Sequence, residues 1–234
     1  MLAASKWSLA PVLAALVLLI VGGSGAYAQI ANTAGPNPQV LGDDGGTGYN
    51  HGHTVPPPPL ASLGGSFELT DQTGRTVTEA TFRGKWMLVY FGYAGCAEAC
   101  PIALQTMAAT LDILGADAEQ VQPVFVDFSV VYARMYHKPA AHAPKIDPVS
   151  FATAIHPRLL LLTGTRRAVY GILRNYKVRQ EHSPLAYGNK EAGMRIDHTT
   201  RIYLVGPDGR MARYYYHSIA PGDLANDLLL KLHS

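Results

Sequence analysis

The chain has 234 residues, of which 48% are hydrophobic and 15% are charged, and its formal net charge is +2. This length fits one domain with appended segments, and the hydrophobic content is sufficient for a buried core. Lys and Arg form no runs, so a nucleic-acid-binding role has no support from the composition.

Residues 1–28 have the features of an export segment. Lys6 precedes an apolar run over 9–21, and Ala26-Tyr27-Ala28 matches the small-x-small pattern of a cleavage site. The uncharged stretch over 7–28 is also about long enough to span a bilayer as an anchor. We expect a signal peptide or an uncleaved membrane anchor, with cleavage favoured. Either outcome predicts an exported protein, free in the periplasm or tethered to the inner membrane, in an oxidising compartment.

Residues 29–59 are predicted to form a disordered tether. Gly, Pro, Asn and Thr dominate this stretch, and Pro56–Pro59 is expected to form a stiff polyproline spacer. His51 and His53 could bind a metal loosely, but a solvated linker is the favoured interpretation.

From about residue 60 the sequence alternates between strand-like and helix-like segments. Strands are predicted at Phe67–Thr70, Thr76–Thr78, Trp86–Phe91, Val121–Phe128, Leu159–Leu162, Arg201–Val205 and Met211–Tyr216. Helices are predicted at Pro101–Leu114, Phe151–Ile155, Arg166–Tyr176 and Asp223–His233. This order predicts a thioredoxin-like α/β sandwich over residues 60–234. A mixed central sheet would carry helices on both faces, with an N-terminal hairpin ahead of it.

Both cysteines of the chain, Cys96 and Cys100, lie between a predicted buried strand and a predicted helix. A bridge closing so short a loop restricts the unfolded chain little, so a purely stabilising disulfide is disfavoured. Residues i and i+4 of a helix have Cβ atoms about 5–6 Å apart, wider than the roughly 3.5–4.5 Å of a disulfide. Two thiolates binding a soft metal tolerate that separation. A nearby helix N-terminus would also favour both thiolates. Redox cycling and metal binding both remain open, and metal binding is slightly favoured.

A soft metal held by two thiolates is under-coordinated, and Asp197-His198 offers an imidazole just before the strand predicted at 201–205. A lone histidine in this position is more often structural. The wider pattern, however, resembles the Sco/SenC family of copper-binding proteins involved in cytochrome c oxidase assembly. The resemblance covers residues 60–234 and rests on Gly64–Leu69, Gly84–Trp86, Tyr90–Tyr93, Cys96-x-x-x-Cys100-Pro101, Thr163–Thr165, Asp197–Thr200 and Tyr203–Gly209.

The resemblance implies that Cys96, Cys100 and His198 bind one copper ion per domain, as Cu(I) or Cu(II). It also implies that Asp127 lies close to the site. The function implied is that of a copper chaperone for the copper centre of cytochrome c oxidase. The expected partner is oxidase subunit II or another copper-receiving protein, and a thiol reductase is a further candidate partner.

The chain departs from the family pattern at two places. Ala97 stands where the family commonly has Pro directly after the first cysteine. The family's Asp-Pro-x-Arg-Asp-Thr run after the second buried strand is reduced to Asp127-Phe128-Ser129, and a Pro-rich excursion over 132–148 follows it. This excursion contains Met135, His137 and His142, which we do not expect to be primary ligands, because ordering a mobile loop costs entropy.

The main alternative is a thiol–disulfide oxidoreductase that keeps oxidase subunit cysteines reduced through Cys96 and Cys100. The fold supports it, although enzymatic activity is not the favoured expectation for this chain. Thioredoxin-like reductases, however, place two residues between their cysteines and carry a cis proline where this chain has Thr199-Thr200. A peroxidase using Cys96 would lack a resolving cysteine outside the turn.

Overall fold

The structure is a computed structural model that describes residues 40–41, 58–93, 96, 99–132, 147–183 and 195–234. These residues belong to one compact unit, Pro38–Ser234. The predicted export segment and most of the predicted tether lie outside the described residues.

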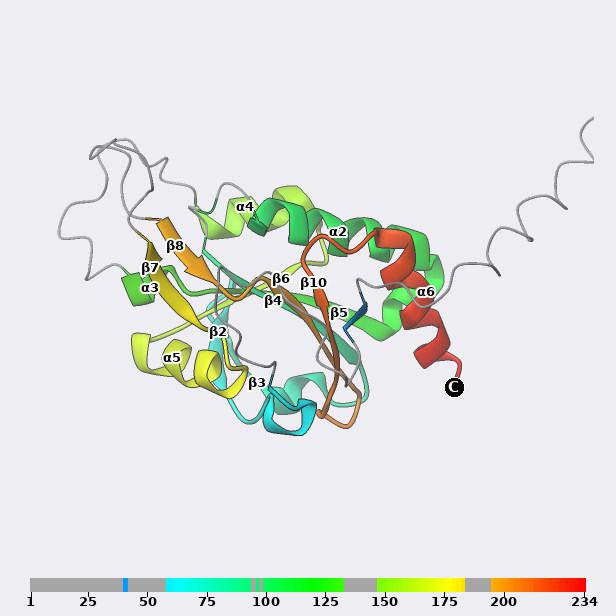
Figure 1. The fold of residues 1–234 in the computed structure, drawn as a ribbon, viewed down its shortest axis with the longest axis horizontal. Helices are drawn as coiled ribbons and strands as arrows, with labels where there is room; N and C mark the ends of the chain where they lie inside the picture. The colour runs from blue at the N-terminus through cyan, green and yellow to red at the C-terminus, as the bar shows by residue number, and fades with distance from the viewer. Residues whose placement is uncertain (1–39, 42–57, 94–95, 97–98, 133–146, 184–194) are drawn as a thin grey trace, which may run out of the picture. The chain divides into compact units, whose positions relative to one another are not determined.

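The described strands form an eight-stranded sheet in the order β1-β10-β9-β4-β5-β6-β2-β3 (Figure 1). Their bounds are β1 Val40–Leu41, β2 Glu68–Asp71, β3 Thr76–Thr78, β4 Trp86–Gly92, β5 Val121–Asp127, β6 Leu160–Thr163, β9 Arg201–Val205 and β10 Met211–Tyr216. β4, β5 and β6 run parallel, whereas the β9–β10 and β2–β3 hairpins pair antiparallel. A separate two-stranded sheet contains β7, Gln180–Ser183, and β8, Arg195–His198.

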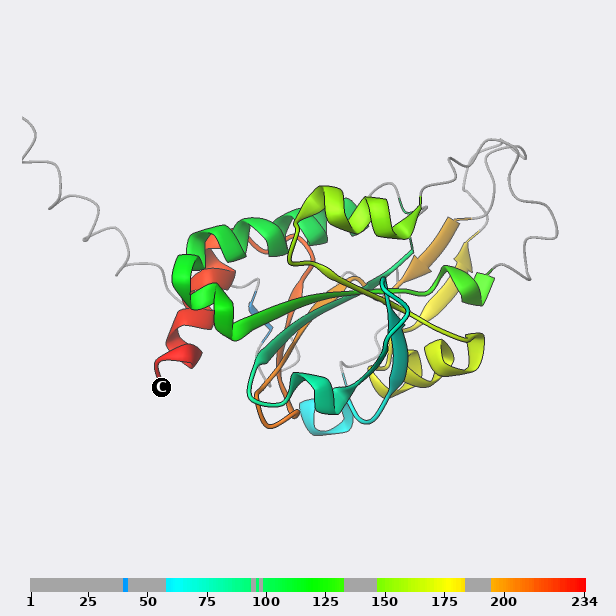
Figure 2. The same ribbon diagram turned by 180° about the vertical axis from the view of Figure 1, so that it is seen from behind.

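Helices cover both faces of the large sheet, as the two opposite views show (Figures 1 and 2). One face carries α2 (Ala99–Leu114), α4 (Pro148–Ile155) and α6 (Pro221–Leu232), and the other carries α3 (Ser129–Tyr132) and α5 (Arg166–Asn175). Short 3-10 helices are η2 (Leu60–Ser62), η3 (Glu79–Phe82) and η4 (Gly115–Gln120). The prediction of a thioredoxin-like α/β fold with a mixed sheet is therefore confirmed.

β4 shows why this sheet has two cores. Nearly every side chain of the strand is buried, and successive side chains of a strand point to opposite faces. Val89 and Phe91 belong to the core beneath α5, while Leu88 and Tyr90 belong to the core beneath α2. A continuous apolar run is thus the signature of a strand that is covered on both sides.

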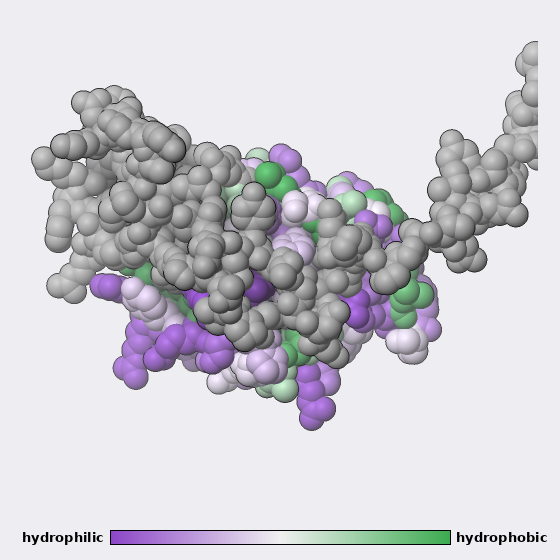
Figure 3. All heavy atoms as spheres, viewed as in Figure 1, coloured by the Kyte–Doolittle hydropathy of each residue, from purple (hydrophilic) through white to green (hydrophobic). Residues whose placement is uncertain are grey.

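The helices differ in how far they are buried. In α5, Val169, Ile172 and Leu173 face the sheet, while Arg167 and Arg174 are exposed. The outward side of this helix is correspondingly hydrophilic in Figure 3. Together α2 and η4, Ala99–Gln120, are long and apolar enough to cross a membrane by length and composition alone. The buried residues of α2 pack on the sheet, which identifies it as a core helix of this domain.

Two pairings differ from the sequence-based expectation. Val40–Leu41, inside the predicted disordered tether, pairs with Tyr215 and Tyr214 of β10, so disorder does not hold at these two residues. The β7–β8 hairpin was not predicted either, because QEHS and RIDH are short and lack a clear apolar alternation. This hairpin matters for function, because His198 is the last residue of β8.

Candidate metal centre

The two cysteines lie at the carboxyl end of β4, where the chain turns into α2. The N–H of Cys96 donates to the carbonyl of Tyr93 at 2.9 Å, which closes the turn. Cys100 is the second residue of α2 and is fully buried, whereas Cys96 is partly exposed, and the two cysteines do not form a disulfide. Cys96 therefore precedes the helix instead of sharing a helical face with Cys100. A disulfide would require Cys96 to lie outside a regular helix, and it does. The two cysteines can therefore either form a disulfide or bind a metal.

Gly92 makes room for the buried thiol. A Cβ atom at this position would lie 2.6 Å from Cys100 Sγ and 3.0 Å from the ring of Phe125. Real Cβ atoms do not approach other heavy atoms so closely, so any larger residue would displace the thiol. The last residue of β4 must be small because Cys100 packs directly against the strand.

His198 is oriented by its neighbours. Its Nδ1 atom lies 3.0 Å from the carbonyl oxygen of Thr199, so the tautomer that suits this contact carries the proton on Nδ1. Nε2 is buried and has no hydrogen-bond partner among the described residues. The ring also packs against Tyr90, Tyr93 and Phe128 at centroid distances of 6.3, 6.1 and 5.1 Å. This arrangement leaves a fixed imidazole with an unused lone pair.

The three predicted ligands come together. Donor atoms of Cys96, Cys100 and His198 all lie within 4.8 Å of one another. Two bonds of about 2.0–2.3 Å to a common ion span at most about 4.6 Å, so only a small closure would place one metal between them. Two soft sulfurs and one imidazole form a donor set that suits Cu(I) and can also hold Cu(II). The residues present therefore fit copper.

One electrostatic expectation was wrong. The helix N-terminus was expected to favour the thiolate, but burial raises the pKa of the Cys100 thiol well above its usual value, and the neighbouring Cys96 raises it further. The backbone at Tyr93 and the hydroxyl of Tyr90 act in the opposite direction, with smaller effects. Desolvation is the largest cause because Cys100 has no access to solvent.

Asp127 lies next to this centre, at the end of β5. It is buried and is paired in register with Gly92 of β4. Its Oδ1 accepts hydrogen bonds from the hydroxyl of Ser129, at 2.6 Å, and from the backbone N–H of Ser129, at 3.3 Å. The implied position of Asp127, close to the site, is consistent with this register.

The structure does not place the side chains of the other residues that the sequence analysis named. His51, His53, Ala97, Met135, His137 and His142 lie outside the described residues. Asp197 is placed by its backbone, which pairs with Glu181 across the β7–β8 hairpin.

Two further residues of this region were missed by sequence reasoning. Tyr90 is buried in the same core cluster as Cys100. In the sequence it lies within a continuous apolar run, so nothing distinguishes it from the other core residues of the strand. His217 directly follows β10, and burial lowers the pKa of its imidazole. Only strand pairing connects His217 with the site, so no local pattern could have identified it.

The fold and the site together define a thioredoxin-like domain with a Cys-Cys-His group. Comparison with known proteins identifies its family. The SCO1/SenC family model matches residues 56–130 and 148–232, which is more than half of the chain. The chain therefore belongs to the SCO1/SenC family. The two matched segments flank the Pro-rich excursion, which confirms that this stretch departs from the family pattern.

Two curated relatives match about two thirds of the chain. The mitochondrial SCO2 homolog of Mus musculus is 34% identical over 160 residues, which is 66% of this chain and 56% of the relative. The mitochondrial SCO1 homolog of Homo sapiens is 29% identical over 165 residues, 70% of this chain and 50% of the relative. The chain thus spans about half the length of these curated relatives.

Solved structures agree in fold. ScoI of Bradyrhizobium japonicum with copper bound has a TM-score of 0.57 and 29% identity, covering 72% of this chain and 98% of that one. ScoI of Arabidopsis thaliana with copper bound has a TM-score of 0.58 and 26% identity, covering 73% and 98%.

Proposed function

We propose that this protein is a copper metallochaperone that binds one copper ion through Cys96, Cys100 and His198 and serves assembly of the copper centre of cytochrome c oxidase. The observation that carries the proposal is the convergence of these three donor groups within 4.8 Å. Two relatives of the same fold have copper bound. A further solved structure, that of BsSco, is of a member of the Sco family of cytochrome c oxidase assembly proteins.

The uneven burial of the two thiols suits transfer of a metal. Cys100 is buried and holds its position against Gly92, while Cys96 is partly exposed. A thiolate of a partner, such as oxidase subunit II, would approach from the side of Cys96, and the ligands would exchange one at a time. A site of three ligands with one exposed releases its cargo more readily than a closed site of four ligands.

Copper stoichiometry on the reduced full-length protein tests the ligand assignment. Cys96→Ser or Cys100→Ser should abolish tight Cu(I) binding, and His198→Ala should weaken binding and change the Cu(II) spectrum. His233→Ala is the matched control, because this histidine is exposed near the C-terminus and pairs with Asp117. An unchanged Cu(II) spectrum in His198→Ala would rule out the third ligand.

A second candidate is a thiol–disulfide oxidoreductase, and two cysteines in the reduced, dithiol form at the end of β4 favour it. The partly exposed Cys96 would be the attacking thiol, since the raised pKa of Cys100 makes that sulfur the poorer nucleophile. Thiol trapping distinguishes the two functions. Copper loading should protect both cysteines from alkylation if they bind the metal, and equal alkylation with and without Cu(I) would favour the reductase.

The same proposal includes the location of the protein. Residues 1–28 export the chain, and residues 60–234 bind copper outside the cytoplasm. Where residues 1–28 stay uncleaved, the part of 29–59 that does not pair with β10 links the domain to the membrane. Cell fractionation with protease treatment of spheroplasts tests this arrangement, because an exported domain is either released with the periplasmic fraction or cleaved at the spheroplast surface without lysis. Protection of the domain in intact spheroplasts would contradict export.

A further inference from the structure

His217 lies beside the loop that carries His198. β10 ends at Tyr216, and the N–H of His217 donates to the carbonyl of Thr200 at 3.2 Å. Tyr216 is paired with Arg201 in register, so this bond continues the β9–β10 pairing by one more residue. Thr200 follows His198 by two positions, and the pairing therefore brings the two histidines to the same end of the sheet.

The strand register also determines the face on which His217 lies. Tyr215 and Ile202 are direct partners, and both belong to the core cluster that contains Tyr90 and Cys100. Directly opposed residues of an antiparallel pair share a face, and side chains two residues apart return to that face. His217 is two residues beyond Tyr215, so it projects toward the α2 side, where the buried thiol lies.

The ring of His217 has an unused donor atom. Its Nδ1 is buried and has no hydrogen-bond partner within the part of the chain that the structure describes. The same is true of Nε2 of His198. His217 is also near enough to His198 and Cys96 for their charges to act on it. An unpaired buried ring nitrogen is costly, and a bound ion is one way to satisfy it.

We propose that His217 is a fourth, oxidation-state-dependent ligand of this centre, which coordinates Cu(II) but not Cu(I). The inference rests on the proposed copper-binding function and adds a residue to its site. Cu(II) favours four donors in a tetragonal arrangement with nitrogen ligands, whereas Cu(I) suits the thiolates. His217 is outside the group of donor atoms that lie within 4.8 Å of one another. Coordination therefore requires its ring to turn toward the site.

Electron paramagnetic resonance of the Cu(II)-loaded full-length protein tests this proposal directly. With ¹⁵N-labelled histidine, the wild type should show hyperfine coupling from two imidazoles, and His217→Gln should show coupling from one. The Cu(II) affinity of His217→Gln should fall about tenfold or more, the scale seen when groups that tune a metal site are removed. The Cu(I) affinity should not change, and His233→Gln should match the wild type in both measurements.

The outcomes separate this inference from the proposed function. Wild-type protein that binds copper with a single coupled imidazole overturns the role of His217 and leaves the three-ligand site in place. Wild-type protein that binds no copper overturns both. A count of one imidazole on the wild type overturns the proposal without any variant, and if His217→Gln fails to fold, His217→Asn supplies the comparison that assigns the second imidazole to His217. An equal loss of Cu(I) and Cu(II) affinity in a folded His217→Gln protein would also contradict the proposal.

Discussion

At the scale of single residues, the candidate centre depends on close packing around one sulfur atom. The sulfur of Cys100 packs against Gly92, in the space that a side chain at this position would occupy. The burial of Cys100 raises the pKa of its thiol. The same packing that holds the sulfur in place therefore makes it resist ionisation. Two predictions follow from this packing.

Gly92→Ala should destabilise the domain by about 1–3 kcal/mol, the usual cost of overpacking a core, and should weaken copper binding. The reason is the 2.6 Å approach that the added Cβ would make to Cys100 Sγ. Thermal unfolding and Cu(I) competition measure the two effects. Gly171→Ala in α5 is the matched control, because a Cβ there meets no atom within 4 Å. Similar losses in both variants would show that packing against the thiol is not the cause.

Copper uptake should depend on pH because of Cys100. A thiol must lose its proton before it can bind a metal, and burial raises the pKa of this thiol. The Cu(I) affinity should therefore rise as the pH increases, with a proton released on binding. Calorimetry in buffers of different ionisation enthalpy counts the released protons. In the metal-free protein, Cys96 should be alkylated faster than Cys100, and the reverse order would contradict the assigned burial.

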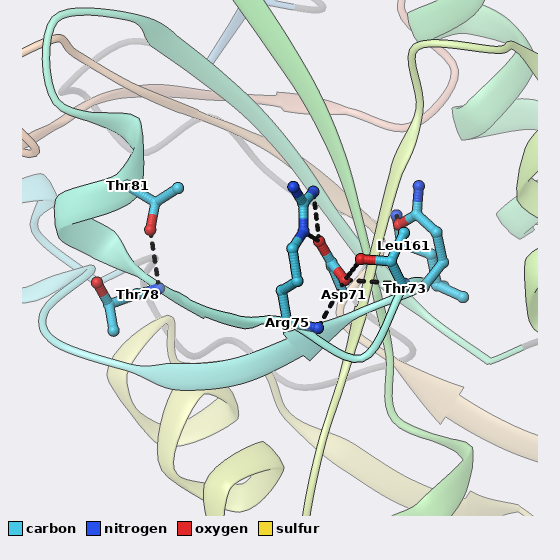
Figure 4. Close-up of polar contacts among 7 residues, drawn as sticks. Asp71, Thr73, Arg75, Thr78, Thr81 and Leu161 are labelled. Carbon is cyan, nitrogen blue, oxygen red and sulfur yellow. Dashed lines mark hydrogen bonds and ion pairs between the residues drawn. The ribbon is translucent and has the colours of Figure 1, made fainter.

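At the scale of elements, the β2–β3 hairpin is closed by one carboxylate (Figure 4). Asp71 accepts hydrogen bonds from the hydroxyl and N–H of Thr73, at 2.7 and 2.8 Å, and from the N–H and Nε of Arg75, at 3.0 and 2.9 Å. The Thr73 hydroxyl is the largest influence that holds the pKa of Asp71 well below its usual range, and Arg75 adds to it.

The stabilising effect of Asp71 should disappear in acid. Its pKa is lower in the folded chain, so the stabilisation is complete above the unfolded value of about 3.9 and is lost as the pH falls below it. Chemical unfolding between neutral pH and acid should show this loss. Asp71→Asn should be less stable at neutral pH and less sensitive to acid. Asp112→Asn, at an exposed site on α2, should keep the wild-type pH dependence. Equal acid sensitivity in all three proteins would contradict the assignment.

The loop after β8 positions His198 through Thr199. The Thr199 hydroxyl accepts a hydrogen bond from the N–H of Arg179 at 3.0 Å, and the Thr199 N–H donates to the Arg179 carbonyl at 3.1 Å. Thr199→Val keeps the shape but removes the hydroxyl. It should lower Cu(II) affinity by about tenfold without changing the stoichiometry, while Thr199→Ser should bind as the wild type. A normal affinity in Thr199→Val would mean that packing alone positions the histidine.

At the scale of the whole molecule, a domain that delivers copper should matter most when copper is scarce. Deletion of the gene should lower cytochrome c oxidase activity, and added copper should restore part of it. A Cys96→Ser, Cys100→Ser double variant should behave like the deletion, because it removes two of the three proposed ligands. Oxidase activity in membranes across a copper series is the measurement. Rescue by a small-molecule reductant, with no effect of copper, would favour the thiol reductase.

The sequence by itself was sufficient for most of the fold. Apolar runs and helical spacing located β4, β5, α2 and the β9–β10 hairpin to within about two residues, because these elements are buried in regular patterns. The cysteine pair was visible as a chemical motif in the same way. His198, in contrast, was only a candidate from its place before a strand, where a lone histidine is more often structural, and the resemblance to a family made it the expected third ligand.

What only the tertiary structure decided depends on contacts between distant parts of the chain. The need for glycine at Gly92 comes from a thiol eight residues later, and the high pKa of that thiol comes from burial by several elements. His217 lies at the same end of the sheet as His198 because of the register of β9 and β10, which sequence periodicity does not specify. The local sequence pattern predicted the helices, the strands and the cysteine pair, because each depends on residues that are close together in the chain. Pairing and desolvation determined the remaining surroundings of the site, because these arise only when the sheet is assembled.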